Sequence, residues 1–298
     1  KLNLEIENVV LIVDEAHNLP SRVTEMLSSN LTSYMLKNAI LESKKFGYGG
    51  LIKWLQEINK TINDLAKFED KWNREKLIKK DTLLVSVMHV NNEIGTIQSI
   101  EEIGALCKGK GVYFHSDCVQ SFVKLKIDVG KMNLDLISIS GHKVHAPKGI
   151  GFLYVRGGVR LKDVQTGGGQ ENGLRSGTEN VPGIVGLATS LDIKPDVSGI
   201  KKMRDLFVKE LLKIPGTRIN GSLKERIWNN VNVSFYGIEG ESLMLMLDKE
   251  GICVSTGSAC ASSKLNESYV LKAIDVPELY IHGSLRLTLG KISEKDIK

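Results

Sequence analysis

The sequence has few cysteines: four in 298 residues, at Cys107, Cys118, Cys253 and Cys260. Their spacing is too wide for the CxxC pairs of a zinc knuckle, so no metal site is predicted. So few cysteines in a chain of this length are typical of a reducing compartment and exclude a disulfide-stapled scaffold. We therefore expect a cytoplasmic protein.

Long hydrophobic runs and clusters of one charge are also lacking. The longest apolar runs, such as residues 9–13, are far too short to cross a bilayer, and no signal peptide opens the chain. The 40 basic and 35 acidic residues give a net charge of +5 without a dense Lys/Arg cluster, so neither a nucleic-acid nor a membrane partner is expected. The chain begins at Lys1 and stops soon after a strand-like run, and both ends suggest a fragment.

The first eighty residues differ in pattern from the rest. A β-branched apolar run at 9–13 is followed by apolar residues at three- and four-residue steps over 51–72, which predicts a helix with one apolar stripe. From residue 83 onward, short apolar runs alternate with helical stretches. This alternation predicts a parallel or mixed sheet with crossover helices.

The elements expected in this second part are short and closely spaced. Strands are expected at 83–90, 112–115, 134–140 and 151–155, and helices at 100–108 and in part of 118–125. A smaller α+β lobe follows, with helices at 201–212 and 240–248 and strands at 230–236 and 284–289. We therefore expect a mostly helical segment at 1–80, an α/β domain at 81–198 and a small domain at 199–298.

Lys143 stands in Ser-Gly-His-Lys at the end of an expected strand. A lysine that forms a Schiff base must be held near a strand end and partly desolvated, so that its amine can lose a proton. Ser140 and His142 beside it can donate hydrogen bonds to a phosphate. The alternative is a surface lysine that follows a strand.

Polar residues also follow the neighbouring strands, where ligands of α/β sheets bind. Asp117 could pair with the protonated nitrogen of a pyridine ring, and Gln120 could bond the ring oxygen. Asn92 similarly follows the first strand. The alternatives are a helix N-cap for Asp117 and a turn residue before Gly95 for Asn92.

Cys260 lies among small residues, in a stretch with neither a helical nor a strand pattern. A cysteine in such a loop can act as a nucleophile and can carry a second sulfur atom. The alternative is a small buried hydrophobe. Cys253 lies in an apolar run and is expected in the core, and Cys107 and Cys118 are expected to be structural.

Six stretches resemble, in order and spacing, the cysteine desulfurases of the iron–sulfur cluster type (IscS/NifS-like), which are class V aminotransferases, over about residues 81–298. These stretches are VSVMHVNNEIGTIQ, HSDCVQS, SGHKVHAPKGIG, GGGQENGLRSGTEN, STGSACASS and SLRLTLG. The resemblance implies a pyridoxal 5'-phosphate (PLP) enzyme of fold type I, with a partial large domain and a smaller α+β C-terminal lobe. It further implies transfer of sulfur from L-cysteine to an enzyme persulfide with release of alanine, feeding iron–sulfur cluster assembly or tRNA thiolation.

The resemblance also assigns roles to individual residues. Lys143 resembles the lysine bonded to PLP, and Cys260 resembles the sulfur acceptor. Arg286 is similar to the arginine that binds the substrate carboxylate. Thr178 is similar to a threonine that reaches the phosphate of the neighbouring subunit, which implies a homodimer. The cofactor contacts implied are Asn92, Asp117, Gln120, Ser140, His142, Lys143 and Thr178. The stretch around Cys260 resembles the group that hands sulfur to a scaffold or acceptor protein.

Two features depart from the family. His145 and Ala146 stand where many members have an aromatic residue and glycine, and alanine would be strained if that position needs a positive φ. The larger departure is the front, because the family's phosphate-binding loop and ring-stacking histidine are not found in residues 1–80.

Residues 10–20, VLIVDEAHNLP, instead resemble the DEAH motif of XPD-like helicases, which implies a junction between about 68 and 82. Three alternatives to an active desulfurase stay open: an inactive hybrid that acts as a binding module, a helicase-related ATPase fragment, and a selenocysteine lyase. The absence of a GxxxxGK[ST] loop disfavours the ATPase.

Overall fold

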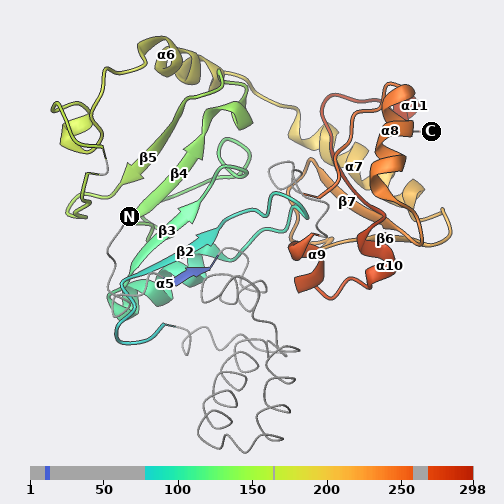
Figure 1. Cartoon of the computed structure of the whole chain (residues 1–298), viewed down its shortest axis with the longest axis horizontal. Coiled ribbons are helices and arrows are strands. Elements are labelled where there is room, and N and C mark those ends of the chain that lie inside the picture. The colour runs from blue at the N-terminus through green and yellow to red at the C-terminus, as the bar shows by residue number, and fades with distance from the viewer. Residues whose placement is uncertain (1–10, 14–77, 164, 258–267, 298) are drawn as a thin grey trace, which may run out of the picture.

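The computed structural model describes residues 11–13, 78–163, 165–257 and 268–297. The expected helix over 51–72 and Cys260 lie outside the described residues. The described chain forms two lobes, a larger one with the strands β1 to β5 and a smaller one with β6 to β8 (Figure 1). Helix α6 (Val181–Ser190) lies at the larger lobe, and the chain runs from it to α7 (Val197–Leu211) in the smaller lobe.

The larger lobe is built on a five-stranded mixed sheet in the order β1-β2-β3-β4-β5. Strands β1 to β4 pair in parallel, whereas β5 is antiparallel to β4. The strands are β1 (Leu11–Val13), β2 (Leu84–Met88), β3 (Tyr113–Asp117), β4 (Leu136–Ser140) and β5 (Gly151–Val155). The expected α/β class and the four strands from residue 83 onward are therefore confirmed, with ends shifted by a few residues. The apolar run at 9–13 contributes the strand that pairs with β2.

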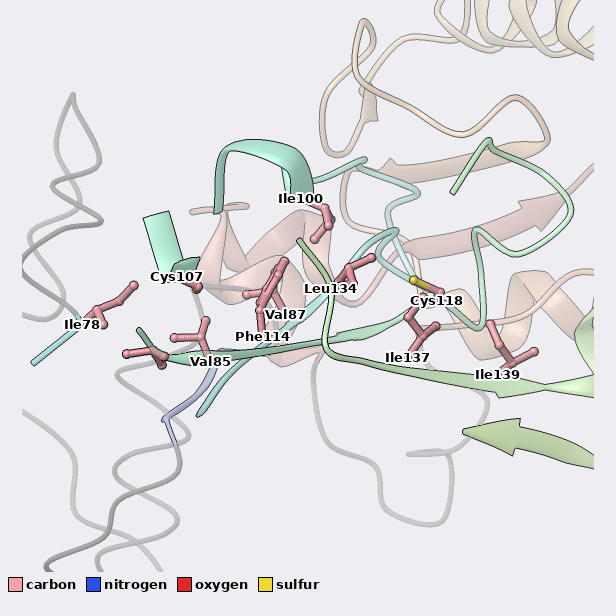
Figure 2. Close-up of a cluster of buried hydrophobic side chains, with 11 residues drawn as sticks. Ile78, Val85, Val87, Ile100, Cys107, Phe114, Cys118, Leu134, Ile137 and Ile139 are labelled. Atoms are coloured by element: carbon pink, nitrogen blue, oxygen red, sulfur yellow. The ribbon is translucent and has the colours of Figure 1, made fainter. Parts of the chain in front are cut away.

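One face of this sheet carries the core of the larger lobe. Helix α5 (Ile100–Lys110) packs there, with buried Ile100 and Cys107 against Val87 and Phe114 (Figure 2). Successive side chains of a strand point to opposite faces, so the alternate residues Asp117 and Ser140 lie on the other, half-buried face. The sheet therefore separates an apolar core from a polar face.

The smaller lobe is a three-stranded antiparallel sheet in the order β6-β7-β8, covered by helices. Its elements are α7 (Val197–Leu211), β6 (Thr217–Ile219), β7 (Asn230–Phe235), α8 (Gly240–Lys249), α9 (Tyr269–Ala273), α10 (Glu278–Ile281), β8 (Ser284–Thr288) and α11 (Glu294–Ile297). The expected α+β lobe and its four predicted elements are confirmed. In the described ranges, no helix is long and apolar enough to cross a membrane.

Two expectations were wrong. Residues 118–125 form successive turns rather than a helix, because Val123 adopts φ +64° and interrupts the helical hydrogen bonding. The condition under which Ala146 would be strained is not met, because His145 and not Ala146 adopts a positive φ, of +67°. Cys253 is exposed rather than part of the core, whereas Cys107 and Cys118 are buried as expected.

Candidate active site

A cavity of about 970 Å³ lies between the two lobes. Its lining includes Asn92, Gln120, His142 and Lys143 from the larger lobe, and Trp228 and Arg286 from the smaller one. Five of the residues expected to bind cofactor or substrate are therefore brought together from segments almost two hundred positions apart. This volume is within the range of ordinary small-molecule sites.

Lys143 is placed by a 3₁₀ helix, η2 (Gly141–Val144), that follows β4 directly. Gly141 fits there because a Cβ atom would meet the carbonyl oxygen of Ile150 at 2.9 Å. Val144 is buried against Leu187 of α6 (Val181–Ser190), and this contact holds η2 against that helix. The Lys143 side chain is exposed and lines the cavity, as a residue that receives a ligand must be.

Asp117 ends β3 and lies next to Ser138 of β4 in the sheet register. Its side chain is half-buried, and its Oδ1 accepts a hydrogen bond of 2.9 Å from the backbone N–H of Val119. The carboxylate therefore holds a turn at the strand end, as the helix-cap alternative partly anticipated. Burial lowers the pKa of His115, two residues earlier on the same face, while the charge of Asp117 acts in the opposite direction.

His115 links the three central strands on this polar face. Its Nδ1 lies 2.6 Å from the Ser86 hydroxyl of β2, and its Nε2 lies 2.8 Å from the Ser138 hydroxyl of β4. These hydrogen bonds join β2, β3 and β4 on the polar face, two residues before Asp117 in β3.

Arg286 and Asn92 meet where the two lobes join. Nη1 of Arg286 donates a hydrogen bond of 3.1 Å to the backbone oxygen of Asn92, and both residues line the cavity. The turn itself is held by Asn91, whose Oδ1 accepts from the backbone N–H groups of Glu93 and Ile94. Asn92 is thus a turn residue, which was the alternative stated for it, and it also lines the cavity.

Of the remaining residues expected to contact the cofactor, some lie in or beside the cavity and others away from it. The Ser140 hydroxyl lies 2.7 Å from Nδ1 of His142, so the pair forms a polar group at the end of β4. Asp117 and Ser140 lie at the same sheet end but outside the cavity lining. Thr178 is exposed and also lies outside that lining. The segment with Cys260 lies outside the described residues.

The donor set suits PLP. The described lining carries six lysine and arginine side chains, with Asp196 as its carboxylate: Lys124, Lys143, Lys194, Lys202, Lys291 and Arg286. Such a lining favours a ligand with a phosphate and a carboxylate group. An amine, an amide and a guanidinium converge on the cavity, and a carboxylate stands at the adjoining sheet end. These groups match the aldehyde, the ring oxygen, a substrate carboxylate and the ring nitrogen, respectively.

Sequence reasoning missed several lining residues, above all Lys124 and Trp228. Lys124 lies four residues after Gln120, and its side chain bonds that of Gln120. Trp228 is 8% exposed and donates its indole N–H to the backbone oxygen of Lys124 at 3.1 Å. The signal for Lys124 was its four-residue spacing from Gln120, which places two side chains on one face of a helix, and no role was assigned to it.

Comparison with known proteins separates the two parts of the chain. The Aminotransferase class-V family model matches residues 55–296, which extends further towards the N-terminus than the expected 81–298. A DEAD_2 model matches residues 1–36, which include the DEAH sequence.

The relatives are cysteine desulfurases. Cysteine desulfurase IscS of Methanosarcina thermophila is 52% identical over 224 residues, which are 74% of this chain and 55% of the relative. Cysteine desulfurase IscS of Dictyoglomus turgidum is 43% identical over 272 residues, 89% of this chain and 68% of the relative. The solved structure of a NifS-like protein superposes with a TM-score of 0.68 at 38% identity, covering 75% of this chain and 60% of that one.

The chain thus spans little more than half of the first relative and about two thirds of the second. The match nevertheless includes every cavity residue discussed above. On its sequence, its fold and its site, the chain belongs to the class V aminotransferases, in the branch of the IscS and NifS cysteine desulfurases.

Proposed function

We propose that this chain is a PLP-dependent cysteine desulfurase, which transfers the sulfur of L-cysteine to Cys260 and releases alanine. The observation that carries the proposal is the convergence of Lys143, Gln120 and Arg286 on one cavity from both lobes. The names of the relatives support cysteine as the substrate. A catalytically inactive module or an ATPase fragment gains no support from the cavity or from these relatives.

The residues divide the work by their chemistry. Arg286 offers a planar pair of donors to the substrate carboxylate, and its bond to Asn92 fixes the guanidinium at the cavity wall. Lys143 would hold the cofactor until the amine of the substrate displaces its own, and the Lys143 amine set free would then take the α-proton of the substrate. Bound PLP would supply a ring that accepts an electron pair, and Asp117 would keep the ring nitrogen protonated.

The sulfur step balances without an external oxidant. The Cys260 thiolate bonds to the sulfur of the substrate, and the carbon–sulfur bond of the substrate breaks. A proton on the former Cβ completes alanine, and Cys260 is left as a persulfide. We also propose the finer points that the resemblance suggests: a homodimer in which Thr178 reaches the neighbouring site, a sulfur-acceptor or iron–sulfur scaffold partner, and a reducing, cytoplasmic location.

The test is a sulfur-transfer assay on the purified full chain with PLP and L-cysteine. We expect alanine to form and a persulfide to appear on Cys260. Cys260→Ser should lose both while keeping the visible absorption of bound cofactor. The matched control is Cys253→Ser, which replaces an exposed cysteine seven positions earlier and should leave the rate unchanged. Alanine formation by Cys260→Ser at the unmodified rate would contradict the role of Cys260. The same assay with selenocysteine would show which substrate is preferred.

A further inference from the structure

Lys124 is a second amine in the cavity of Lys143, and the reaction described above gives it no role. Its backbone is held on both sides. The N–H donates to the Ser121 carbonyl at 3.0 Å, and the carbonyl accepts from the buried Trp228 indole of the smaller lobe at 3.1 Å. The position of Lys124 is therefore fixed by both lobes, unlike that of an ordinary surface lysine.

The side chain of Lys124 contacts Gln120. Its Nζ donates a hydrogen bond of 3.3 Å to Oε1 of Gln120. A lysine ammonium can donate and cannot accept, so the carbonyl end of the Gln120 amide must face it. The NH₂ end of the same amide is then left to face the remainder of the cavity. The contact thereby determines which end of Gln120 a ligand meets.

The surroundings of Lys124 indicate that this contact is shielded from water. Burial, with a smaller contribution from the charge of Lys143, lowers the pKa of Lys124 to about 8. The amine donates to Gln120 in either protonation state, because a neutral amine keeps two N–H groups. A hydrogen bond in a half-buried cavity also orients its partner more firmly than one in water.

We propose that Lys124 is a positioning residue that orients Gln120, so that the Gln120 NH₂ group donates a hydrogen bond to the ring oxygen of the cofactor. This inference rests on the proposed function, because it needs PLP in the cavity. It adds a residue that acts through another one and touches no reacting atom itself. Without Lys124 the amide can turn, and its carbonyl would then face an oxygen that also accepts.

The test uses the full chain loaded with PLP, and its readout is the pH midpoint at which the visible absorption of the bound cofactor changes. A donor to the ring oxygen stabilises the negative charge on that oxygen. Loss of this donor therefore raises the pKa of the proton whose release changes the visible absorption. We expect Lys124→Met to raise the midpoint by about one unit, on the scale at which one hydrogen bond to a charged group acts. Lys124→Arg, which keeps a donor, should leave the midpoint close to that of the unmodified chain.

Removing the charge of Lys124 could also raise the midpoint by itself, and a double-mutant cycle separates the two causes. If Lys124 acts through Gln120, the double variant Gln120→Leu with Lys124→Met shifts the midpoint no further than Gln120→Leu alone. Additive shifts, or an unchanged midpoint in Lys124→Met, would overturn the inference and leave the proposed function standing. An unmodified chain that binds no PLP would instead overturn both.

Discussion

The Ser268 hydroxyl donates a 2.6 Å hydrogen bond to the carboxylate of Glu93, which is 1% exposed. Glu93 comes directly after Asn92, which lines the cavity, and the backbone oxygen of Glu93 accepts from the Asn230 and Asn232 side chains of β7. Ser268 also accepts the backbone N–H of Leu271 at 3.2 Å and so caps α9. One buried carboxylate therefore ties the larger lobe to the helix that follows the Cys260 segment in the chain.

Ser268→Ala removes both of these hydrogen bonds at once. Because it leaves a buried carboxylate short of a donor and a helix without its cap, we expect the free energy of unfolding to fall by about 2–3 kcal/mol. Urea unfolding followed by circular dichroism measures the change. Ser198→Ala is the control, since Ser198 bonds Asp196 at 3.1 Å on the exposed surface and should matter little. Equal effects of the two substitutions would show that the Glu93 contact contributes no more than a surface one.

Val123→Gly should stabilise the protein. Val123 adopts φ +64° with its side chain 38% exposed, a conformation that costs a β-branched residue roughly 1–2 kcal/mol. Glycine removes that strain and adds a smaller entropic cost in the unfolded chain, so we expect a net gain of roughly 0.5–1 kcal/mol.

The matched control for Val123 is Val185→Gly, in the exposed face of α6, where φ is helical. Glycine in a helix interior destabilises, so the two valine-to-glycine substitutions should shift the midpoint of thermal unfolding in opposite directions. A loss of stability in both variants would mean that Val123 is not strained.

His89 should make the protein sensitive to mild acid. The ring is 5% exposed, and burial lowers its pKa to about 4 from 6.5. Between these two values the unfolded chain binds the proton more tightly than the folded one. Stability is therefore fully present above about pH 6.5 and is lost as the pH falls towards 4, by roughly 3 kcal/mol in all.

Unfolding curves measured across this pH window, for the unmodified chain and for His89→Gln, test the assignment. The variant should show a flatter dependence, with a remainder from His115, whose pKa burial also lowers. An unchanged slope in His89→Gln would assign the acid sensitivity to other groups.

Much of the fold could be predicted, because most strands of the larger lobe coincide with short apolar runs separated by turns. The expected strand 151–155 matches β5 at both ends, and the polar residues after β3 and β4 stand at one sheet end as the parallel order requires. Local pattern carried this information, and the family motifs added the residue roles.

What could not be predicted depends on contacts between distant parts of the chain. A glutamate such as Glu93 is predicted to lie at the surface, and only the fold brings Ser268, 175 positions later, into hydrogen bonding with its carboxylate. The backbone at Val123 reads as helical, because a valine is the least expected residue at a positive φ. The exposed Cys253 shows the same limit, since an apolar run does not say which of its faces is covered.

The proposed function requires that Lys143 holds PLP in the cavity between the lobes. The most direct measurement is borohydride reduction of the full chain after incubation with PLP, followed by peptide mass mapping. We expect a yellow protein with one cofactor fixed on Lys143 and none on Lys124, and a colourless Lys143→Ala variant. A protein that stays colourless and releases PLP on washing, or cofactor spread over Lys124 and surface lysines, would contradict it.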